Sequence, residues 1–307
     1  MKLGFGLPTA GAWATPPAID VVAQRAESLG YSSLWTFQRL LYALEPRNEY
    51  YGAPGGVWPE AFKRTLDPIV VLTLAAACTR DIRVGVSVLI VPFYQPIVLA
   101  KQLATLDYVS RGRLDVGLGI GWSLDEFEAV GAAAKGRGAR ADEFIRCLKT
   151  VWTQERVEFE GEFYRIPPCR VEPKPVQRPH PPIFVGGYND AVLRRAAALG
   201  DGYTGGNIPL ADLATVVGRV RAAAEQAGRD PVTFPIVCRG AFNLTPAPLG
   251  AGRRALWGSA DEIRDDVRRY ADAGVTELFL DPNFQPGGAV LDRVLGQMEA
   301  LAPKGGR

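Results

Sequence analysis

Short apolar runs alternate with stretches of helical periodicity along the whole chain, and this alternation limits the possible folds more than any other feature. The predicted strands cover residues 2–7, 32–35, 82–89, 113–119, 182–186, 200–203, 234–242 and 276–280. The predicted helices cover residues 18–29, 67–79, 97–109, 139–152, 190–199, 210–227, 261–273 and a last stretch that ends near residue 301. Continuously apolar strands separated by helices indicate a parallel sheet buried on both faces.

The number of strand–helix units predicts how this sheet closes. About eight units in 307 residues favour a single (β/α)₈ barrel, and an open doubly wound sheet is the alternative. Residues 38–66, after the second strand, and residues 155–177, after the fourth, exceed the simple repeat. The second of these holds a predicted hairpin around Glu160-Gly161-Glu162. We interpret both stretches as insertions in one domain that covers residues 1–307, and loops of this length are usually functional or mobile.

Three predicted helices end in a glycine that is followed at once by the next strand. These glycines are Gly30, Gly200 and Gly274. Glycine adopts the left-handed conformation that closes a helix without strain, so we expect such a cap at Gly30 and the same short connection at the other two junctions.

Charge and cysteine usage exclude several classes of protein. Lys and Arg total 35 against 33 Asp and Glu, so the chain lacks the basic excess of proteins that bind nucleic acid or anionic membranes. No apolar run approaches the roughly 20 residues that span a bilayer, and the first residues do not resemble a signal peptide. The four cysteines match no disulfide or zinc motif, and no cluster of ligands predicts a metal site. We therefore expect a cytoplasmic protein that acts on a small molecule.

Glycine-rich segments follow several predicted strands, at the end of a barrel where active sites lie. Residues 117–122, Gly-Leu-Gly-Ile-Gly-Trp, do not form the dinucleotide fingerprint GxGxxG, because positions 122 and 124 are Trp and Leu. Their alternate glycines either leave bare backbone for a flat ring or allow close packing. Backbone N–H groups in the turns at Gly186-Gly187 and Gly205-Gly206, each before a helix, predict a phosphate site.

Two further polar features are assigned structural roles. His180 is the only histidine and precedes a strand, so it belongs to the end of the barrel away from the active site. We expect it to be structural or exposed, and without it no Ser-His-Asp set can form. Residues 123–126, Ser-Leu-Asp-Glu, have the pattern of a capping box and predict the start of a helix.

Several blocks of sequence, in this order, resemble the luciferase-like oxidoreductases, and together they cover nearly the whole chain. Any one block is common, whereas the ordered set is specific. The blocks are Leu34-Trp35-Thr36; Val86-Ser87-Val88-Leu89 with Pro92, Gln95 and Pro96; Leu106-Asp107 with residues 110–114; residues 117–122 with Asp125-Glu126; residues 182–187; and Gly200-Asp201-Gly202-Tyr203.

The resemblance implies a TIM-like barrel that binds coenzyme F420 or, as the alternative, reduced FMN, and that often forms a homodimer. It implies a bulge in the third strand with a non-prolyl cis peptide between Ser87 and Val88, which would back the tricyclic ring. The glycine turns would hold the ribityl phosphate. The cofactor-binding residues implied in this way are Ser87, Val88, Gly119, Ile120, Gly121, Gly186, Gly187, Tyr188, Gly205, Gly206 and Asn207.

The chain departs from the family pattern after the second strand, where many members carry an acidic residue and a catalytic histidine. The matching pair here is Gln38-Arg39, and Trp122 stands where some F420 enzymes have a glutamate. Arg39 stays protonated, so it can hold an anion or polarise a carbonyl but is a poor proton shuttle. We assign catalytic positions to Gln38, Arg39 and Trp122, with a tyrosine or Glu45 as proton donor. The expected pocket walls are Trp13, Trp35, Tyr42, Tyr94 and Trp122.

Three functions follow from the resemblance, in decreasing order of support. The first is hydride transfer between F420 and an activated C=C or C=N bond, or the reverse oxidation, because a deazaflavin passes hydride and reacts little with oxygen. The second is an FMNH₂-dependent monooxygenase. The third is a non-catalytic flavin-binding barrel, which the missing acid–histidine pair permits. All three are expectations by analogy.

Overall fold

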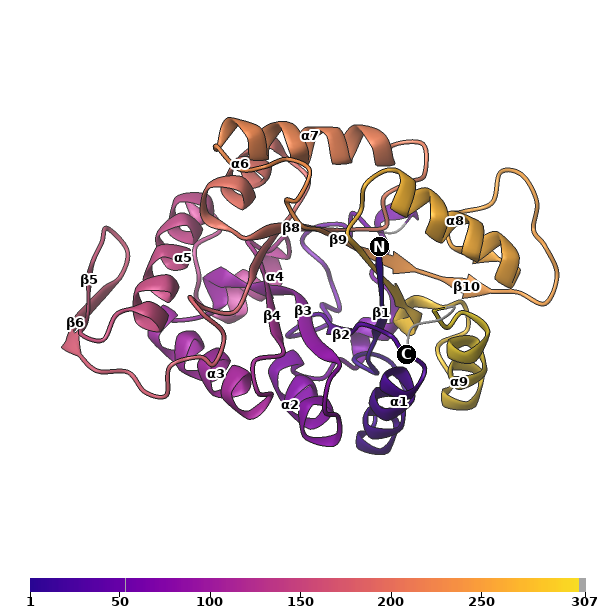
Figure 1. Ribbon diagram of the computed structural model, residues 1–307, viewed down its shortest axis with the longest axis horizontal. Coiled ribbons are helices and arrows are strands. Elements are labelled where there is room, and N and C mark those ends of the chain that lie inside the picture. The colour runs from indigo at the N-terminus through magenta and orange to yellow at the C-terminus, as the bar shows by residue number, and fades with distance from the viewer. Residues whose placement is uncertain (53, 304–307) are drawn as a thin grey trace.

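The computed structural model describes residues 1–52 and 54–303, in which eight parallel strands close into a barrel (Figure 1). Around the barrel the strands run in the order β1-β12-β9-β8-β7-β4-β3-β2. This confirms the predicted closed barrel over the open sheet. The strands are β1 (Lys2–Gly6), β2 (Ser33–Thr36), β3 (Arg83–Ile90), β4 (Leu114–Gly119), β7 (Ile183–Gly186), β8 (Gly202–Gly206), β9 (Ile236–Ala241) and β12 (Glu277–Asp281).

Helices cover the outside of the barrel, and their start signals are local. Asp67, for example, accepts hydrogen bonds from the N–H groups of Ile69 (2.9 Å) and Val70 (3.0 Å) at the start of α2. No helix within the described part of the chain is long and apolar enough to cross a membrane. The helices are α1 (Pro16–Ser28), α2 (Pro68–Cys78), α3 (Pro96–Val109), α4 (Leu124–Ala129), α5 (Arg137–Thr153), α6 (Asp190–Leu199), α7 (Leu213–Gln226), α8 (Ala260–Asp272) and α9 (Leu291–Ala300).

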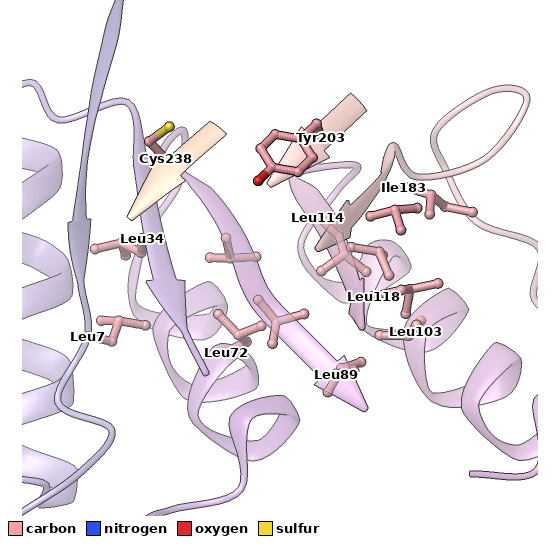
Figure 2. Packing of buried hydrophobic residues seen from close by; sticks show 14 of the residues in the cluster. Leu7, Leu34, Leu72, Leu89, Leu103, Leu114, Leu118, Ile183, Tyr203 and Cys238 are labelled. Carbon is pink, nitrogen blue, oxygen red and sulfur yellow. The ribbon is translucent and has the colours of Figure 1, made fainter. Parts of the chain in front are cut away.

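Apolar side chains fill the space between strands and helices, as Figure 2 shows for Leu34, Leu72 and Leu103. Inside the barrel, Trp35 stacks on Phe279 with ring centroids 5.1 Å apart. A Cβ at Gly85 would lie 2.7 Å from the Trp35 ring, so this strand position requires glycine. The barrel interior is therefore packed beneath its mouth, and Trp35 is a core residue.

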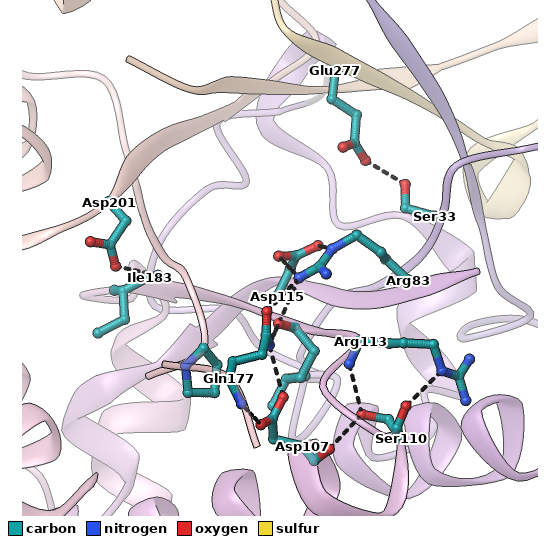
Figure 3. A network of polar contacts seen from close by, with 12 residues as sticks. Ser33, Arg83, Asp107, Ser110, Arg113, Asp115, Gln177, Ile183, Asp201 and Glu277 are labelled. Atoms are coloured by element: carbon teal, nitrogen blue, oxygen red, sulfur yellow. Dashed lines mark hydrogen bonds and ion pairs between the residues drawn. The ribbon is translucent and has the colours of Figure 1, made fainter. Parts of the chain in front are cut away.

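A polar network closes the end of the barrel that is opposite the mouth (Figure 3). Arg83 pairs with the buried carboxylate of Asp115 at 2.6 Å, and Gln177 bonds to Asp107 at 2.8 Å. Burial raises the pKa of Asp115, and Arg83 opposes that shift. His180 lies at this end too, buried against Trp152 with ring centroids 5.9 Å apart, as expected for a structural residue.

The two expected insertions are present. Residues 155–177 contain an antiparallel hairpin, β5 (Val157–Glu160) and β6 (Arg165–Cys169), which projects from the barrel (Figure 1). The hairpin is centred on Glu160-Gly161-Glu162 as predicted, and β6 begins only at Arg165, because the N–H groups of Phe163 and Tyr164 bond to the carboxylate of Glu143 instead of a strand. The pair β10 (Asn243–Leu244) and β11 (Trp257–Gly258), after β9, was not predicted.

The insertion of residues 38–66 folds onto the mouth of the barrel. It contains two short 3₁₀ turns, η1 (Pro54–Gly56) and η2 (Glu60–Lys63). Its aromatic side chains Tyr50, Trp58 and Phe62 form, with Ala10 and Phe37, a second apolar cluster that is separate from the main core. The insertion thus builds a wall above the strand ends.

The predicted left-handed cap is present at Gly30, with φ of 81°, and a glycine makes the short helix-to-strand connection at all three junctions. Gly274 is also left-handed, with φ of 96°, whereas Gly200 has φ of −88° and a different reason for glycine, since a Cβ there would lie 2.8 Å from the carbonyl oxygen of Ala196. The predicted capping box needs correction. Ser123 does accept a hydrogen bond from the N–H of Glu126 (3.2 Å), but the Glu126 carboxylate turns to the N–H of Leu40 (2.7 Å) and leaves the capping box half formed.

The side chain of Glu262 fixes the backbone of the segment between β9 and α8. Its carboxylate accepts hydrogen bonds from the N–H groups of Leu249 (3.0 Å), Gly250 (2.8 Å) and Ser259 (2.8 Å), and the last of these completes a capping box. These backbone donors, that of Leu249 first, lower the pKa of Glu262 from 4.5 to about 2. The charged form is therefore built into the fold.

We expect Glu262→Gln to destabilise the protein at neutral pH and to have much less effect in acid. A carboxylate with a depressed pKa in the folded state stabilises the fold fully above its unfolded pKa, near 4.5, and loses that contribution as the pH falls towards 2. Urea unfolding of both proteins at neutral pH and at about pH 3 measures the effect. A destabilisation of equal size at the two pH values would contradict this assignment.

Candidate active site

A cavity of about 260 Å³ opens at the carboxyl ends of the barrel strands. The lining comes from the ends of β2, β3, β4, β7, β8 and β9 and from the insertion of residues 38–66. The residues from the sequence prediction that line it are Gln38, Arg39, Ser87, Val88, Gly119, Ile120, Gly121, Trp122, Gly186, Gly187, Tyr188, Gly205 and Gly206. Asn207 does not line it, because its side chain accepts a hydrogen bond from the N–H of Ala241 (3.0 Å) and closes the end of β9.

The third barrel strand bulges at the floor of this cavity. The Ser87–Val88 peptide is cis, as the resemblance implied, and the pairing of β3 with β4 shifts between Val86 and Leu89. The Ser87 hydroxyl lies 3.0 Å from that of Thr204 on β8, so a hydrogen bond crosses the barrel. The bulge thereby presents the Val88 side chain towards β4 and β7.

The alternate glycines of β4 make room for this bulge. A Cβ at Gly119 would lie 2.5 Å from Val88 Cγ2, and one at Gly186 would lie 2.8 Å from Val88 Cγ1. Close packing, one of the two explanations left open by the sequence, is therefore a sufficient reason for glycine at these positions. The same absence of side chains leaves backbone along the cavity wall, where Gly119, Gly121 and Gly186 all contribute.

The turn between β7 and α6 combines a glycine with a well-formed helix start. Gly187 has φ of 144°, a conformation that other residues adopt only with strain. Asn189 caps α6 by accepting a hydrogen bond from the N–H of Val192 (3.0 Å). The Tyr203 hydroxyl donates to Gly187 O (2.9 Å), and the Tyr188 hydroxyl donates to Gly206 O (3.0 Å). The two predicted phosphate turns are thus joined into one unit.

Arg137, at the start of α5, contributes a positive charge to the same side of the cavity and was missed from the sequence. Its Nε is buried and has no hydrogen-bond partner within residues 1–52 and 54–303. Arg195 of α6 donates to Gly138 O (3.0 Å), which holds the start of α5 against α6. Glycines on both sides, Gly136 and Gly138, were the available signal. An unpartnered guanidinium nitrogen beside a helix N-terminus fits the phosphate of a phosphorylated cofactor.

Arg39 forms an ion pair inside the protein. Its side chain is buried, its Nη1 lies 2.9 Å from Glu126 Oε2, and its guanidinium carbon lies 4.8 Å from the centroid of the Trp122 ring. Burial lowers the pKa of Arg39 and raises that of Glu126, and each charge opposes the shift of the other. Arg39 thus lines the cavity with its charge paired to Glu126, and its catalytic assignment stays a prediction.

Gln38 and Trp122, the other two positions predicted to be catalytic, also make internal contacts. Gln38 Oε1 accepts a hydrogen bond from the N–H of Ile90 (2.7 Å), and its Nε2 donates to the Tyr94 hydroxyl. Gln38 therefore ties the end of β2 to the end of β3. Trp122 packs against Tyr50 and Trp58, with ring centroids 5.2 Å and 5.0 Å away, and forms the upper wall of the cavity.

Four of the five expected wall residues do not line the cavity and make their contacts elsewhere. Trp13 Nε1 donates to Asn283 (3.2 Å), and Trp35 Nε1 donates to Glu277 (2.8 Å). Tyr94 bonds to Gln38, and Tyr42 packs edge-on against Trp58. The walls are formed instead by Phe37, Tyr50, Tyr51, Phe62, Trp122 and Tyr188. Glu45 is exposed and does not line the cavity.

Arg239 of β9 is a further cation that the sequence reasoning missed. It lines the cavity, and its Nε lies 3.9 Å from the buried Asp281 Oδ2. Burial opposes its charge, but neighbouring phenols and Asp281 outweigh that effect and hold the pKa above its usual value. An arginine inside the apolar strand Ile236-Val237-Cys238-Arg239 was the signal, since charged residues are rarely buried without a role.

The chain belongs to the luciferase-like monooxygenase family, whose profile matches residues 4–251. An uncharacterised protein of Mycobacterium tuberculosis is 30% identical over 289 residues, which is 91% of this chain and 99% of that protein. The FMNH₂-dependent dimethylsulfone monooxygenase of Pseudomonas putida is 42% identical over 135 residues, which is 43% of this chain and 37% of that enzyme.

Solved structures share the fold over almost the full chain. Monooxygenase RslO1 from Streptomyces bottropensis superposes with a TM-score of 0.82 at 26% identity, covering 98% of each chain. The coenzyme F420-dependent tetrahydromethanopterin reductase from Methanopyrus kandleri superposes with a TM-score of 0.75 at 17% identity, covering 97% of this chain and 98% of that one. Proteins similar to this chain in sequence or in fold thus include an FMNH₂-dependent and an F420-dependent enzyme, and the chain belongs to a family of oxidoreductases.

Proposed function

We propose that the protein is an F420-dependent oxidoreductase that reduces a small organic substrate by hydride transfer at the barrel mouth. The observation that carries this proposal is the set of ionisable groups at the cavity. The described lining residues carry guanidinium and phenol groups and neither a carboxylate nor an imidazole. Both kinds of group are protonated at neutral pH, so they donate hydrogen bonds and stabilise negative charge but do not accept a proton, and the phenols can in addition supply one. Such a site favours reduction of the substrate over its oxidation.

A reduction of this kind needs a hydride and a proton. When bound, reduced F420 would supply a hydride, which delivers two electrons and one hydrogen to a C=C or C=N bond. One proton must then reach the substrate to complete the reduction. Tyr50 and Tyr51 line the cavity with hydroxyl groups that can deliver it. Tyr51 is 64% exposed as a whole residue, while burial of its hydroxyl raises the pKa of Tyr51 and keeps that group protonated at neutral pH.

The cofactor would be held by the features already described. The turn of residues 186–189 and Arg137 would bind the phosphate, because they offer backbone N–H groups, a helix N-terminus and an unpaired guanidinium nitrogen. The ring would lie against the bulge at Ser87 and Val88 and beside the backbone of residues 119–121.

Turnover with reduced F420 tests this proposal. The protein is mixed anaerobically with reduced F420 and a panel of enones, α,β-unsaturated acids and imines, and the absorbance of oxidised F420 is followed together with the reduced product. Oxidation of F420 in proportion to product supports the proposal. No oxidation with any member of the panel, together with oxygen uptake when FMNH₂ replaces F420, would contradict it.

A second function, FMNH₂-dependent monooxygenation, is supported by a specific observation. The 42% identity to the dimethylsulfone monooxygenase over 135 residues and the 26% identity to the monooxygenase of known structure are sequence likenesses, whereas the F420-dependent structure at 17% identity shows the fold alone. Substrate-dependent oxygen consumption with FMNH₂, measured with an oxygen electrode, would establish this second function.

We expect Arg137→Gln to weaken the binding of FMN, used as a phosphorylated probe, by roughly tenfold to a hundredfold. A hydrogen bond to a charged group contributes about 1.5–3 kcal/mol, and the variant removes the charge at this position. Riboflavin, which has the same ring without the phosphate, should bind equally to both proteins. Quenching of flavin fluorescence measures both constants, and an equal loss for the two flavins would remove Arg137 from the phosphate site.

A further inference from the structure

A second cavity of about 370 Å³ adjoins the cavity at the barrel mouth, and we call it the side pocket. The two share Tyr50, Tyr51, Tyr188, Gly206 and Arg239. The remaining lining of the side pocket is Gly52, Asn207, Ile208, Pro209, Asp212, Val216 and Arg254. Tyr51 and Tyr188 pack edge to face between the cavities, with ring centroids 5.8 Å apart. A ligand at the barrel mouth can therefore extend past these rings towards the start of α7.

Arg239 lies at the junction of the two cavities, and its charge is incompletely paired. Its side chain is only 15% exposed, and the carboxylate of Asp281 is 3.9 Å from its Nε, beyond hydrogen-bond distance. Asp281 Oδ1 is occupied by the side-chain and backbone N–H groups of Asn283. Among the hydrogen bonds formed within residues 1–52 and 54–303, none has an Arg239 guanidinium nitrogen as donor and none reaches Asp281 Oδ2, and the guanidinium carbon lies 5.1 Å from the Phe284 ring. A buried guanidinium in this state has several donors free for a ligand.

The other positively charged side chains around the two cavities are paired, are assigned to the cofactor phosphate, or are exposed to solvent. Arg39 pairs with Glu126, and Arg137 lies beside the helix N-terminus that would take the cofactor phosphate. Arg254 is exposed at the side pocket with its guanidinium over Trp257, and the exposed Asp212 lines the same pocket. Arg239 is thus the buried cation that remains for the substrate.

We propose that Arg239 binds an anionic group of the substrate, and that the substrate is a flat, conjugated acid whose carboxylate lies at this junction. The planar fork of the guanidinium matches the two oxygens of a carboxylate, and Tyr50, Tyr51 and Tyr188 provide flat apolar surface for the conjugated part. The assignment of the reducible bond to the barrel mouth rests on the proposed function, whereas the anion site does not.

Binding of a matched pair of probes tests the anion site without turnover. Calorimetric titrations compare trans-cinnamate, a flat conjugated carboxylate, with cinnamamide, its uncharged isostere. We expect the protein to bind cinnamate roughly tenfold or more tightly than cinnamamide. Arg239→Gln should abolish that preference, Arg239→Lys should keep part of it through the retained charge, and Arg254→Gln should leave most of it. Thermal unfolding of each variant checks that it is folded.

Two results would overturn the proposal. One is equal or undetectable binding of the two probes by the unaltered protein; the other is a preference for cinnamate that survives in folded Arg239→Gln. A cofactor phosphate is a second source of negative charge, and the flavin pair separates it. Arg239→Gln should leave the preference for FMN over riboflavin intact, and loss of that preference would place the cofactor phosphate at Arg239 and contradict the proposal. Failure of F420 turnover leaves these binding results unaffected, so the two failures are distinguishable.

Discussion

Arg39→Ala is expected to destabilise the protein by about 3–5 kcal/mol, because removing one partner of a buried ion pair leaves the other charge buried without compensation. The partner is Glu126, whose side chain is 1% exposed. From the sequence, Arg39 was assigned a catalytic position. The ion pair predicts that the variant loses stability and that a loss of activity follows from this. Urea unfolding of the variant measures the loss, which would appear as a lower midpoint with an unchanged slope.

The pH dependence of that loss identifies its cause. Burial raises the pKa of Glu126, and in Arg39→Ala nothing comparable opposes the shift. A carboxylate whose folded pKa is raised binds a proton on folding, so the variant gains stability as the pH falls and loses it as the pH rises through the folded pKa. Unfolding at pH 5 and at pH 8 should therefore show a smaller deficit at the lower pH. The double variant Arg39→Met with Glu126→Leu should recover much of the stability, and no recovery would show that the pair is not the cause.

Gly117→Ala is expected to destabilise the barrel by about 3 kcal/mol, since overpacking against a fixed neighbour costs at least 1–3 kcal/mol. A Cβ at this position would lie 2.1 Å from the carbonyl oxygen of Val86, which is backbone of β3 and cannot move aside as a side chain would. The substitution should also disturb the bulge at Ser87 and Val88 and so weaken flavin binding. Thermal and urea unfolding, with flavin titration, measure both effects.

Gly218→Ala is the matched control for this substitution. Gly218 lies within α7, is exposed, and has no atom within 4 Å of the Cβ that alanine would add. Alanine there should stabilise the protein by roughly 0.5–1 kcal/mol, because it reduces the conformational entropy of the unfolded chain. Equal behaviour of the two variants would mean that the close approach of β3 and β4 does not require glycine.

The barrel was predictable because each unit carries its own signals. Strands such as Arg83–Ile90 are mostly apolar and rich in β-branched residues, and helix starts such as Asp67-Pro68 carry a cap and a proline in sequence. Gly200 and the β10–β11 pair were not predictable in this way. Their form depends on neighbours that are distant in the sequence, such as the Ile183 carbonyl 3.1 Å from the Cβ that Gly200 lacks.

The site was predictable only where the backbone defines it. Glycine turns are visible in a sequence, and the turn of residues 186–189 does line the cavity. The roles of charged residues depend on partners that the sequence does not reveal. Arg39 appeared free until Glu126, 87 positions later, proved to be its partner, whereas Arg239 stood in an apolar strand and drew no attention. A pairing of this kind is decided by the closure of the barrel and by the insertion above it.

Parallel titration of the unliganded protein with oxidised F420 and with FMN, followed by ligand fluorescence, tests the central claim most directly. The claim is that the barrel mouth is a deazaflavin site with protonated groups around it. It predicts a lower dissociation constant for F420 than for FMN. Binding of FMN that is tighter by about tenfold or more, which is 1.4 kcal/mol in favour of the flavin, would contradict it and favour the monooxygenase.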